Sequence, residues 1–388
     1  MRLSSLPLQN LMRIPKGIMD KKTSELIDLG FIVDYKNPGL PYYPPIGDII
    51  LSNVRNMVMR KHSEVGALKI KMPSFMRRDL LNQGEKIEET FKKKFVMVPE
   101  PMEKYMLLTT HEAEILDYLS RDKISHKALP LKLFTNKDIL RPIKDPKGIL
   151  KCREFEVVMM LSLDKDRVSF NESLEAYKHI SESIFGDLNI PVRLCLGGEN
   201  RRGSHLDFDL EYFYEGEEGD NLVLDDSEGR VKALSLSMGY EFMPSVNKVS
   251  LISSGNEEIK PVVGTYAIGL ERVLYTAFDS SRDNQGFNLP KQIRPFDSSV
   301  LLFDVDSQAS NSLANKIYQG LNESGSRVLY DDRKRIKRKE KAELSDFLGI
   351  PIKIIVSKSG ISINDRKLNK EARFDNPQEV IKYIKNVN

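Results

Sequence analysis

The rhythm of strands and helices changes about three-quarters of the way along the chain, at the proline-containing segment NLPKQIRPFD (288–297). Before it, short alternating apolar runs separated by turns predict an antiparallel sheet decorated by helices. After it, strand-like and helix-like segments alternate, as is typical of a small α/β domain with a mainly parallel sheet. At 388 residues the chain exceeds one ordinary hydrophobic core, so two domains are expected.

Composition excludes several classes of protein. With 40% hydrophobic and 30% charged residues, the chain is expected to be globular. Its apolar stretches fall short of the roughly 20 residues that a membrane-spanning helix needs, so no membrane association is expected. The two cysteines, Cys152 and Cys195, lack paired spacing, which argues against a disulfide framework and a structural zinc site. The histidines form no metal-binding spacing, and the sequence assigns no metal ligands.

The first nineteen residues, MRLSSLPLQNLMRIPKGIM, carry Arg2, Arg13 and Lys16 and two serines before the first acid, Asp20. This pattern is weakly similar to a mitochondrial transit peptide. We therefore expect a candidate targeting segment over 1–19 and a place in the mitochondrial matrix. The alternative is a plain start, as in an enzyme of a bacterial cytoplasm.

The segment GTYAIGLERVL (264–274) joins a strand to a helix and places Glu271 and Arg272 within an otherwise apolar run. One interpretation is that Arg272 is a solvated residue on an amphipathic helix. The other is that its guanidinium, which does not titrate and has a fork suited to phosphate oxygens, binds a ligand. Gly264 and Gly269 would let the backbone approach that ligand closely.

Three segments occur in an order that resembles motifs 1, 2 and 3 of the class II aminoacyl-tRNA synthetases. They are a helix and strand ending at Pro73 (47–73), a hairpin (133–164) and the strand and helix at 264–275. The finer resemblance is to prolyl-tRNA synthetases, of the compact bacterial or mitochondrial type without an inserted editing domain. It covers almost the whole chain and rests on LLTTHEAEILDYL, SHKALPLKLF, REF, GSH, LPKQIRPFD, VLYDDR and LGIPIKIIV.

The resemblance implies an α+β fold, in which a class II synthetase antiparallel sheet flanked by helices is followed by a small α/β anticodon-binding domain. We expect the catalytic domain over 20–290 and the anticodon-binding domain over 297–388. The implied activity is ATP-dependent ligation of proline to tRNA through an enzyme-bound prolyl-adenylate, with ATP and Mg²⁺ as cofactors. Motif 1 implies a homodimer.

Adenylate formation brings a carboxylate and a phosphate together, so it needs fixed cations and positioning. The resemblance implies that Arg272 contacts the triphosphate and that Arg141 holds the α-phosphate and the proline carboxylate, which makes these two the catalytic residues. Phe155 would stack on adenine, Arg153 would support the hairpin or the nucleotide, and Gly269 would line the ATP site.

Motif 2 can be aligned in two registers. Anchoring on the RP dipeptide places Lys137 at the first arginine of the motif and predicts a damaged site. Anchoring on the strand after LPLKLF places Arg141 there and leaves the turn one residue short. We prefer the second register, because deletions are tolerated in turns whereas a slip within a strand reverses every side chain.

The resemblance also assigns the substrate residues. Thr110 and Glu112 match the family's T-x-E, in which a carboxylate meets the cationic imino group of proline, and His205 in GSH and Gly264 complete the proline-binding set. We interpret His111 as a local structural residue. A basic run, DDRKRIKRKEK (331–341), is either a solvated helix face or a tRNA contact made by Arg333, Arg335, Lys337, Arg338 and Lys339.

Several family residues are replaced. Pro142 and Ile143 stand where an acid is expected after the motif 2 arginine, and Val158 and Met159 replace a lysine and an aspartate. Ser237 replaces a glutamate, and losing carboxylates near ATP would weaken magnesium coordination. Two functions therefore stay open: a working ligase, and a catalytically degenerate paralogue that acts as a nucleic-acid-binding or accessory subunit.

Overall fold

The structure is a computed structural model of the chain. It describes residues 1–5, 26, 30–33, 39–83, 101–102, 104–107, 110–195, 198–199, 205–206, 208–213, 220–223, 230–243, 248–366 and 368–387. The chain divides into two compact units. Residues 34–42 and 54–277 form the central unit, and residues 1–33, 43–53 and 278–388 form the terminal unit.

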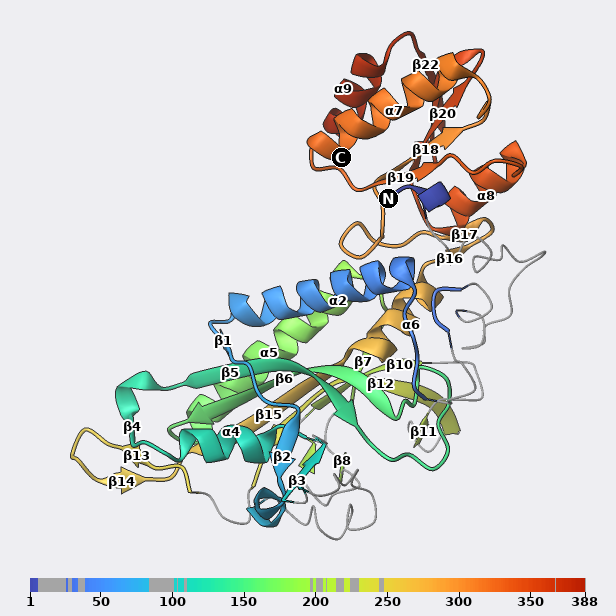
Figure 1. The fold of residues 1–388 in the computed structure, drawn as a ribbon. Coiled ribbons are helices and arrows are strands. Elements are labelled where there is room, and N and C mark those ends of the chain that lie inside the picture. Colours follow the sequence, from blue (N-terminus) through green and yellow to red (C-terminus); the bar gives the residue numbers. More distant parts are fainter. Residues whose placement is uncertain are drawn as a thin grey trace. The chain divides into compact units, whose positions relative to one another are not determined.

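The central unit is built on a large sheet whose strand pairs are antiparallel except for one parallel pair at an edge (Figure 1). Its strand order is β1 (Leu68–Lys69), β5 (Leu131–Leu140), β6 (Glu154–Asp164), β15 (Val262–Gly269), β12 (Arg230–Glu241), β10 (Phe208–Phe213) and β7 (Arg193–Cys195), and β11 (Asp220–Val223) also pairs with β12. The predicted hairpin of motif 2 is the pair β5–β6. The predicted α+β fold class with an antiparallel sheet is confirmed.

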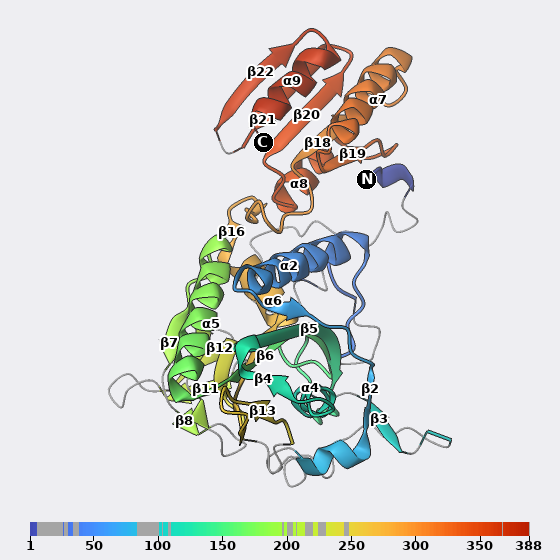
Figure 2. The same cartoon turned by 90° about the vertical axis from the view of Figure 1, so that its left-hand side faces the viewer.

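Helices cover both faces of this sheet (Figure 2). Helix α5 (Arg167–Asp187) begins at the N-cap Asp166, whose side chain accepts a hydrogen bond from the Ser169 N–H. It packs on the face that carries Tyr266, whose ring centroid lies 4.6 Å from that of Tyr177. Helix α4 (Glu112–Leu119) buries Ile115 and two leucines on the opposite face. The two faces therefore follow the period-2 alternation of the strands.

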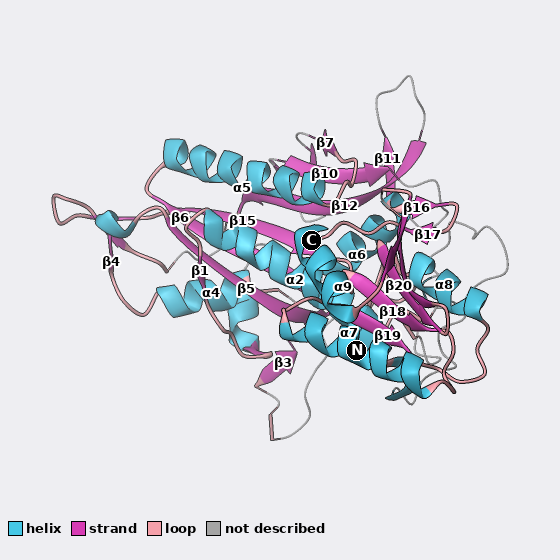
Figure 3. Cartoon of the chain, turned by 90° about the horizontal axis from the view of Figure 1, so that it is seen from above, coloured by secondary structure: helices cyan, strands magenta, loops and turns pink. Residues whose placement is uncertain are grey.

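Two further helices link the sheet to the rest of the chain. Helix α2 (Pro45–Glu64) precedes β1, as predicted for the helix and strand of motif 1. Helix α6 (Leu270–Ser280) follows β15 directly, as predicted for the strand and helix at 264–275. Figure 3 shows the helices and strands by type, with α5 running beside β6, β15 and β12.

Short elements complete the central unit. They are the strand pair β2 (Phe75–Arg77) and β3 (Tyr105–Leu107), the sheet of β14 (Glu258–Ile259), β13 (Leu251–Ile252) and β4 (Ile124–Ser125), the pair β8 (Gly198–Glu199) and β9 (His205–Leu206), and the 3-10 helices η2 (Arg78–Gln83) and η3 (His126–Ala128).

The terminal unit contains a five-stranded sheet in the order β19 (Val328–Asp331), β18 (Ser298–Leu302), β20 (Ile352–Ser357), β21 (Gly360–Asp365) and β22 (Lys370–Phe374). The pairs that involve β18 are parallel, as predicted, but β20–β21 and β21–β22 are antiparallel. Strands β21 and β22 were not predicted from the sequence, because the segment between β20 and the last helix was interpreted as a connecting loop.

Three helices pack on this second sheet. They are α7 (Gln308–Glu323), α8 (Arg338–Phe347) and α9 (Pro377–Val387). Residues of α7 and α9 join one apolar cluster with Val300 and Leu302 of β18. The intervening Ser299 instead shares a hydrogen bond with Ser345 of α8, at 2.7 Å. Helix α8 therefore covers the other face. A strand pair, β16 (Arg282–Asp283) and β17 (Gly286–Phe287), precedes the sheet.

Of the candidate targeting segment 1–19, the structure describes residues 1–5, which include the 3-10 helix η1 (Leu3–Ser5). These residues lie along β19 of the terminal unit. The Tyr330 N–H donates to the Met1 carbonyl at 2.8 Å, and the Ser4 backbone N–H and hydroxyl donate to Asp332 at 3.0 and 2.7 Å. Residues 6–19 lie outside the described residues.

Among the helices that the structure describes, none has both the length and the apolar character needed to cross a bilayer.

His62 of α2 is buried against the large sheet. Its ring lies 5.4 Å from those of Phe134 and Tyr177, and its Nδ1 lies 2.8 Å from the Val58 carbonyl oxygen. Burial lowers the pKa of His62 to about 4. The unfolded chain takes up a proton near the ordinary value of 6.5, and the folded chain takes it up only near 4. Stability is therefore complete above about pH 6.5 and is lost as the pH falls through this window.

We predict that His62→Phe makes the central unit less sensitive to acid, because the phenylalanine ring that then fills the site cannot be protonated. Protonation of His62 should cost the folded state roughly 3 kcal/mol by about pH 4. The melting temperature should therefore fall less between about pH 7 and about pH 5 in the variant than in the parent. The exposed His179 on α5 gives the control His179→Gln, and an equal fall in His62→Phe and in this control would contradict the prediction.

Candidate active site

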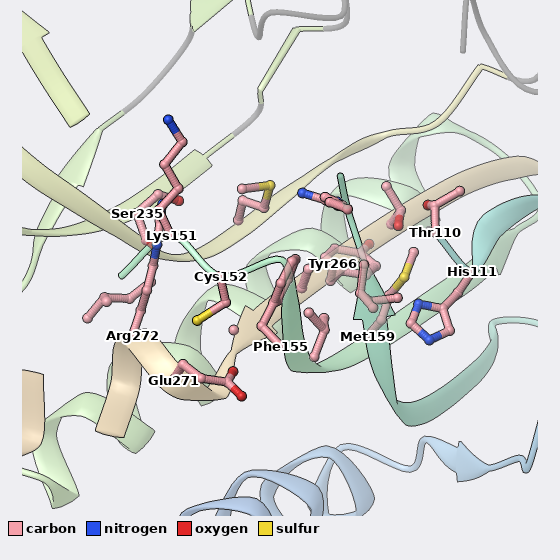
Figure 4. Close-up of a pocket in the computed structure, with 18 of the residues that line it drawn as sticks. Thr110, His111, Lys151, Cys152, Phe155, Met159, Ser235, Tyr266, Glu271 and Arg272 are labelled. Carbon is pink, nitrogen blue, oxygen red and sulfur yellow. The ribbon is translucent and has the colours of Figure 1, made fainter. Parts of the chain in front are cut away.

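A cavity of about 320 Å³ opens on the face of the large sheet that α4 covers. Strands β5, β6, β12 and β15 supply its floor, and the first turns of α4 and α6 and the turn between β5 and β6 supply its rim. Figure 4 shows Arg272, Lys151 and Ser235 at one end and Thr110 and His111 at the other, with Phe155 and Tyr266 between them. All the lining residues belong to the central unit.

The segment Thr110–Glu112 forms the α4 end of the cavity. Glu112 is 4% exposed, and its carboxylate accepts hydrogen bonds from the Thr110 hydroxyl and from the His111 backbone N–H at 3.1 Å. The Thr265 hydroxyl of β15 donates to the same carboxylate at 3.4 Å. Because Glu112 stands in the first turn of α4, the helix dipole also favours its negative charge. This end of the cavity therefore offers a fixed carboxylate.

His111 lines the cavity but is unsuited to accept a proton. Burial, and then the positive charges of Lys137 and Arg141, lower the pKa of His111 to about 3. The imidazole therefore stays neutral at physiological pH. This agrees with the interpretation of His111 as a local structural residue.

The hairpin β5–β6 brings Arg141 and Phe155 together in the cavity. The Arg141 guanidinium lies 5.2 Å from the centre of the Phe155 ring, and the Arg141 N–H donates to the Arg153 carbonyl at 2.7 Å. Lys137 lies four residues earlier, within β5, where its Nζ donates to the Ser74 hydroxyl at 3.0 Å. It lines a separate hollow with Arg55. The two registers of motif 2 differ in whether Arg141 or Lys137 takes the place of its first arginine. Of these two, Arg141 lines the cavity.

Arg153 is not among the residues that line this cavity. Its Nε donates to the Ile143 carbonyl at 3.1 Å, across the turn of the hairpin, and it lines a third hollow with Leu40 and Pro142. Of the two roles predicted for it, support of the hairpin matches this position.

Arg272 is half-buried at the other end of the cavity. Its Nε donates to the Leu150 carbonyl at 3.1 Å and its Nη1 to the Ser235 carbonyl at 3.0 Å, so the guanidinium is held in a fixed place. Gly269 also lines the cavity, and a Cβ added there would meet nothing within 4 Å. This position does not match the interpretation of Arg272 as a solvated residue on a helix face.

Gly264 has a different surrounding from the one expected. A Cβ on it would lie 2.4 Å from the Tyr266 hydroxyl oxygen and 2.6 Å from the Ser162 hydroxyl oxygen. These groups lie on the α5 face, and Gly264 is not among the cavity-lining residues. The expected close approach to a ligand is corrected to a close approach within the sheet, because strand alternation puts Thr265 on the cavity face and Gly264 on the other.

The Glu271 carboxyl contacts the backbone of Glu156 at the Arg272 end of the cavity. Both oxygens of Glu271 lie 3.0 Å from the backbone nitrogen of Glu156. The Glu156 carboxylate in turn accepts from the Arg55 guanidinium at 2.5 and 2.7 Å and from the Asn136 amide at 2.8 Å. Burial, reinforced by the nearby negative charges of Glu156 and Asp138, raises the pKa of Glu271 to about 8. No local sequence pattern indicates this contact between Glu271 and Glu156.

Lys151 is a cavity-lining cation that the sequence reasoning missed. It lies on the turn between β5 and β6, at the Arg272 end of the cavity (Figure 4). Nothing in the local sequence separates it from Lys144 and Lys147 of the same turn. Only the path of the turn, which folds back toward α6, shows which lysine lines the cavity.

The replaced family residues fall on both sides of the sheet. Ser237 shares a hydrogen bond with Ser181 of α5 at 2.9 Å, so it faces away from the cavity. Met159 and Ile143 line the cavity, whereas Val158 alternates to the other face. The losses at Ser237 and Val158 therefore do not alter the cavity wall.

Some predicted site residues lie elsewhere or outside the description. The backbone of His205 belongs to β9, but its side chain, Gly203 and Ser204 lie outside the described residues. The predicted tRNA-binding residues lie on the terminal unit, around the start of α8. Arg333 pairs with the buried Asp331 at 2.7 Å, while the other four are exposed: Arg335, Lys337, Arg338 and Lys339.

The cavity offers few ligands to a metal ion. Its carboxylates, within the described part of the chain, are Glu112 and Glu271, and both already accept hydrogen bonds from protein groups. Across the same described residues, no group of three or more His, Cys, Asp or Glu side chains is arranged to hold a metal ion. These donors do not fit a magnesium site built by protein ligands alone, which usually draws on one or two available carboxylates.

Comparison with known proteins gives one consistent result, although no protein-family model matches the chain. The proline–tRNA ligase of Xanthobacter autotrophicus is 24% identical over 435 residues and aligns over 98% of each chain. That of Bartonella tribocorum is 23% identical over 424 residues and aligns over 94% of each. The ligase of Brachyspira hyodysenteriae is 28% identical over 239 residues, which are 56% of this chain and 41% of its own.

Solved structures agree in fold. The prolyl-tRNA synthetase of Giardia lamblia, in complex with prolyl-adenylate, superposes with a TM-score of 0.73 at 20% identity over 90% of this chain and 73% of its own. The Cryptosporidium parvum enzyme, complexed with L-proline and AMP, superposes with a TM-score of 0.74 at 17% identity over 95% of this chain and 79% of its own. In sequence along nearly its whole length, and in fold, the chain is similar to the prolyl-tRNA synthetases of class II, which confirms the resemblance predicted from its motifs.

Proposed function

We propose that this chain is a proline–tRNA ligase, which activates proline with ATP as an enzyme-bound prolyl-adenylate and transfers it to tRNA. The observation that carries the proposal is that one cavity has a fixed carboxylate, Glu112, toward one end and a fixed guanidinium, Arg272, at the other, with Phe155 between the ends. Relatives named proline–tRNA ligase that align over nearly the whole chain support the substrate assignment.

The two ends of the cavity suit the two substrates. The negative Glu112, held by Thr110 and Thr265, complements the cationic imino group of proline. Phe155 offers a ring for adenine to stack on, and Arg272 and Lys151 offer positive charge to the phosphates. We assign Arg141, whose guanidinium lies beside Phe155, to the proline carboxylate and the α-phosphate of ATP.

The reaction needs these groups for charge and position. A carboxylate oxygen of proline attacks the α-phosphorus, the bond to the β-phosphate oxygen breaks, and pyrophosphate leaves. Two anions approach in this step, so fixed guanidinium groups that carry their charge at every pH lower the barrier. In the second step a hydroxyl of the terminal tRNA ribose attacks the activated carbonyl, and AMP leaves. Neither step requires the neutral His111 to move a proton.

Magnesium enters the proposal with ATP. It would neutralise phosphate charge as the ion of the bound nucleotide, held mainly by phosphate oxygens and water. The engaged carboxylates Glu112 and Glu271 argue against a protein cage for it. The alternative function, a degenerate accessory subunit, gains no support, since Thr110, Glu112, Arg141, Phe155 and Arg272 share one cavity.

The test is amino-acid-dependent exchange of labelled pyrophosphate into ATP, run with each of the amino acids in turn. Exchange with proline alone is the expected result, because activation is reversible while the adenylate stays bound. Exchange with another amino acid would overturn the substrate assignment. A purified, folded chain that exchanges with none would favour the accessory function.

Motif 2 supplies a direct comparison between two cations of one hairpin, Arg141 and Lys137. Arg141→Ala should lower the exchange rate by about 100-fold or more, because it removes a charge from the reacting centre. Lys137→Ala should lower it by less than about tenfold, since Lys137 donates to Ser74 outside the cavity lining. Steady-state exchange rates at saturating ATP and proline measure both. The reverse order of severity would show that Lys137 takes the place of the motif 2 arginine.

We further propose that the terminal unit binds the anticodon part of tRNA through the exposed basic residues at the start of α8. Arg335, Lys337, Arg338 and Lys339 are exposed there, which leaves them able to reach phosphates. Arg338 and Lys339 form exposed ion pairs with Asp304 and Glu343. Arg333 is left out, because its ion pair with Asp331 is buried. Phosphate contacts release counterions, so such binding weakens as salt rises.

Neutralising these four residues together should raise the dissociation constant for tRNA and flatten its salt dependence by about one unit of slope per lost contact. Exchange of pyrophosphate, which needs no tRNA, should stay near the parental rate. A matched control neutralises four other exposed lysines of the same unit: Lys316, Lys370, Lys382 and Lys385. If both quadruple variants bind tRNA alike at every salt concentration, the basic run 331–341 is a solvated face.

We also propose a homodimer formed through the edge of the large sheet at β1. Among the described strands β1 pairs with β5 alone, and Leu68 is 61% exposed on it. An isologous contact of two such edges fits the motif 1 resemblance.

The dimer proposal predicts a mass of twice the chain at micromolar concentration, measured by sedimentation equilibrium. Leu68→Lys should shift that mass toward the single chain, because it places a charge in the contact. Val168 on α5, 68% exposed, gives the control Val168→Lys, which should leave the dimer intact. A parental chain that is strictly monomeric would remove the proposal.

A further inference from the structure

The ladder between β6 and β15 ends at a backbone N–H that must find another acceptor. Val157 pairs with Gly269, so continuing the register would pair Glu156 with Leu270. Leu270, however, begins α6 and has left the strand. A buried backbone N–H without an acceptor is costly, and the Glu156 N–H lies inside the molecule.

Glu271 supplies the missing acceptor. It is 5% exposed, and both carboxylate oxygens lie 3.0 Å from the Glu156 nitrogen. The side chain of one residue on α6 therefore takes the place of a strand partner. The peptide unit that it holds is the one that joins Phe155 to Glu156, so the contact acts on the backbone directly next to Phe155.

The neighbouring residue on α6 acts on the same hairpin. Arg272 donates to the Leu150 carbonyl on the turn between β5 and β6. Two consecutive residues of the first turn of α6 thus hold the hairpin at two points, one on the strand that carries Phe155 and one on the turn. The Glu156 carboxylate, held by Arg55 and Asn136, is turned away from Glu271 and leaves only its backbone N–H to that contact.

We propose that Glu271 is a positioning residue for nucleotide binding, which fixes the Phe155 ring relative to Arg272 by holding the peptide unit between Phe155 and Glu156. The inference rests on the proposed function only in taking ATP as the ligand of this end of the cavity. Glu271 acts on ATP through Phe155, and Glu112 at the opposite end is outside its reach. Binding of ATP should therefore depend on Glu271, and binding of proline should not.

The test measures dissociation constants for ATP and for proline separately, by titration calorimetry on the full chain. Glu271→Ala should weaken ATP binding roughly tenfold, as expected for the loss of one buried hydrogen bond, and leave proline binding unchanged. Glu271→Gln keeps one oxygen acceptor and should recover most of the loss. Glu154→Ala, at an exposed carboxylate next to Phe155, is the matched control and should bind both ligands as the parent does.

A double-mutant cycle with Phe155→Leu separates positioning from general loosening. If Glu271 acts through the aromatic ring, Glu271→Ala should cost less than about twofold in ATP affinity once the ring is absent. Should Glu271→Ala fail to fold, Glu271→Asp, whose carboxylate is one methylene too short for the contact, takes its place in the cycle.

Additive losses in the cycle, or equal losses of ATP and proline affinity, would overturn the inference. So would unchanged ATP binding in Glu271→Ala, and that result would leave the proposed function intact. A parental chain that binds no ATP would count against both. The readout is binding rather than catalysis, so the result does not depend on which amino acid is activated.

Discussion

The antiparallel pairing of β6 with β15 is the constraint on which the site depends. Its register places Phe155 of β6 just beyond the point where β15 ends and α6 begins. Because the change from strand to helix occurs at Gly269 and Leu270, the next side chains along the chain meet the hairpin instead of continuing the sheet. Thr265, on the same face of β15, contacts Glu112 of α4. One strand therefore sets the place of both ends of the cavity.

The cost of this arrangement is concentrated in two buried carboxyl groups. Glu271 and Glu156 lie close together in the interior, and burial raises the pKa of Glu271 to about 8. Arg55 forms a bidentate ion pair with the Glu156 carboxylate. The Glu271 carboxyl accepts the Glu156 backbone N–H, so its hydrogen bond fixes the strand and not the neighbouring carboxylate.

Much of the fold could be predicted from the sequence, because the elements concerned have strong local signals. The hairpin at β5–β6, the strand and helix at 264–275 and the alternation after residue 297 are examples. The candidate site divides differently. Arg272 and Phe155 stand in recognisable motifs, whereas the contact between Glu271 and Glu156 joins residues 115 positions apart and depends on the register of two strands. Gly264 was misjudged for a related reason, since only the observed alternation shows which face of β15 it occupies. The strands β21 and β22 were missed because their short alternating segments resemble a connection.

We propose that this cavity makes a prolyl-adenylate despite the replaced family residues. The most direct measurement is a single turnover of the purified chain mixed with proline and ATP labelled at the α-phosphate, with the products separated after quenching. We expect a labelled prolyl-adenylate that forms only with proline, stays with the protein and is converted to AMP when tRNA is added. Labelled AMP that forms at the same rate with and without proline, and no adenylate at any time, would contradict it.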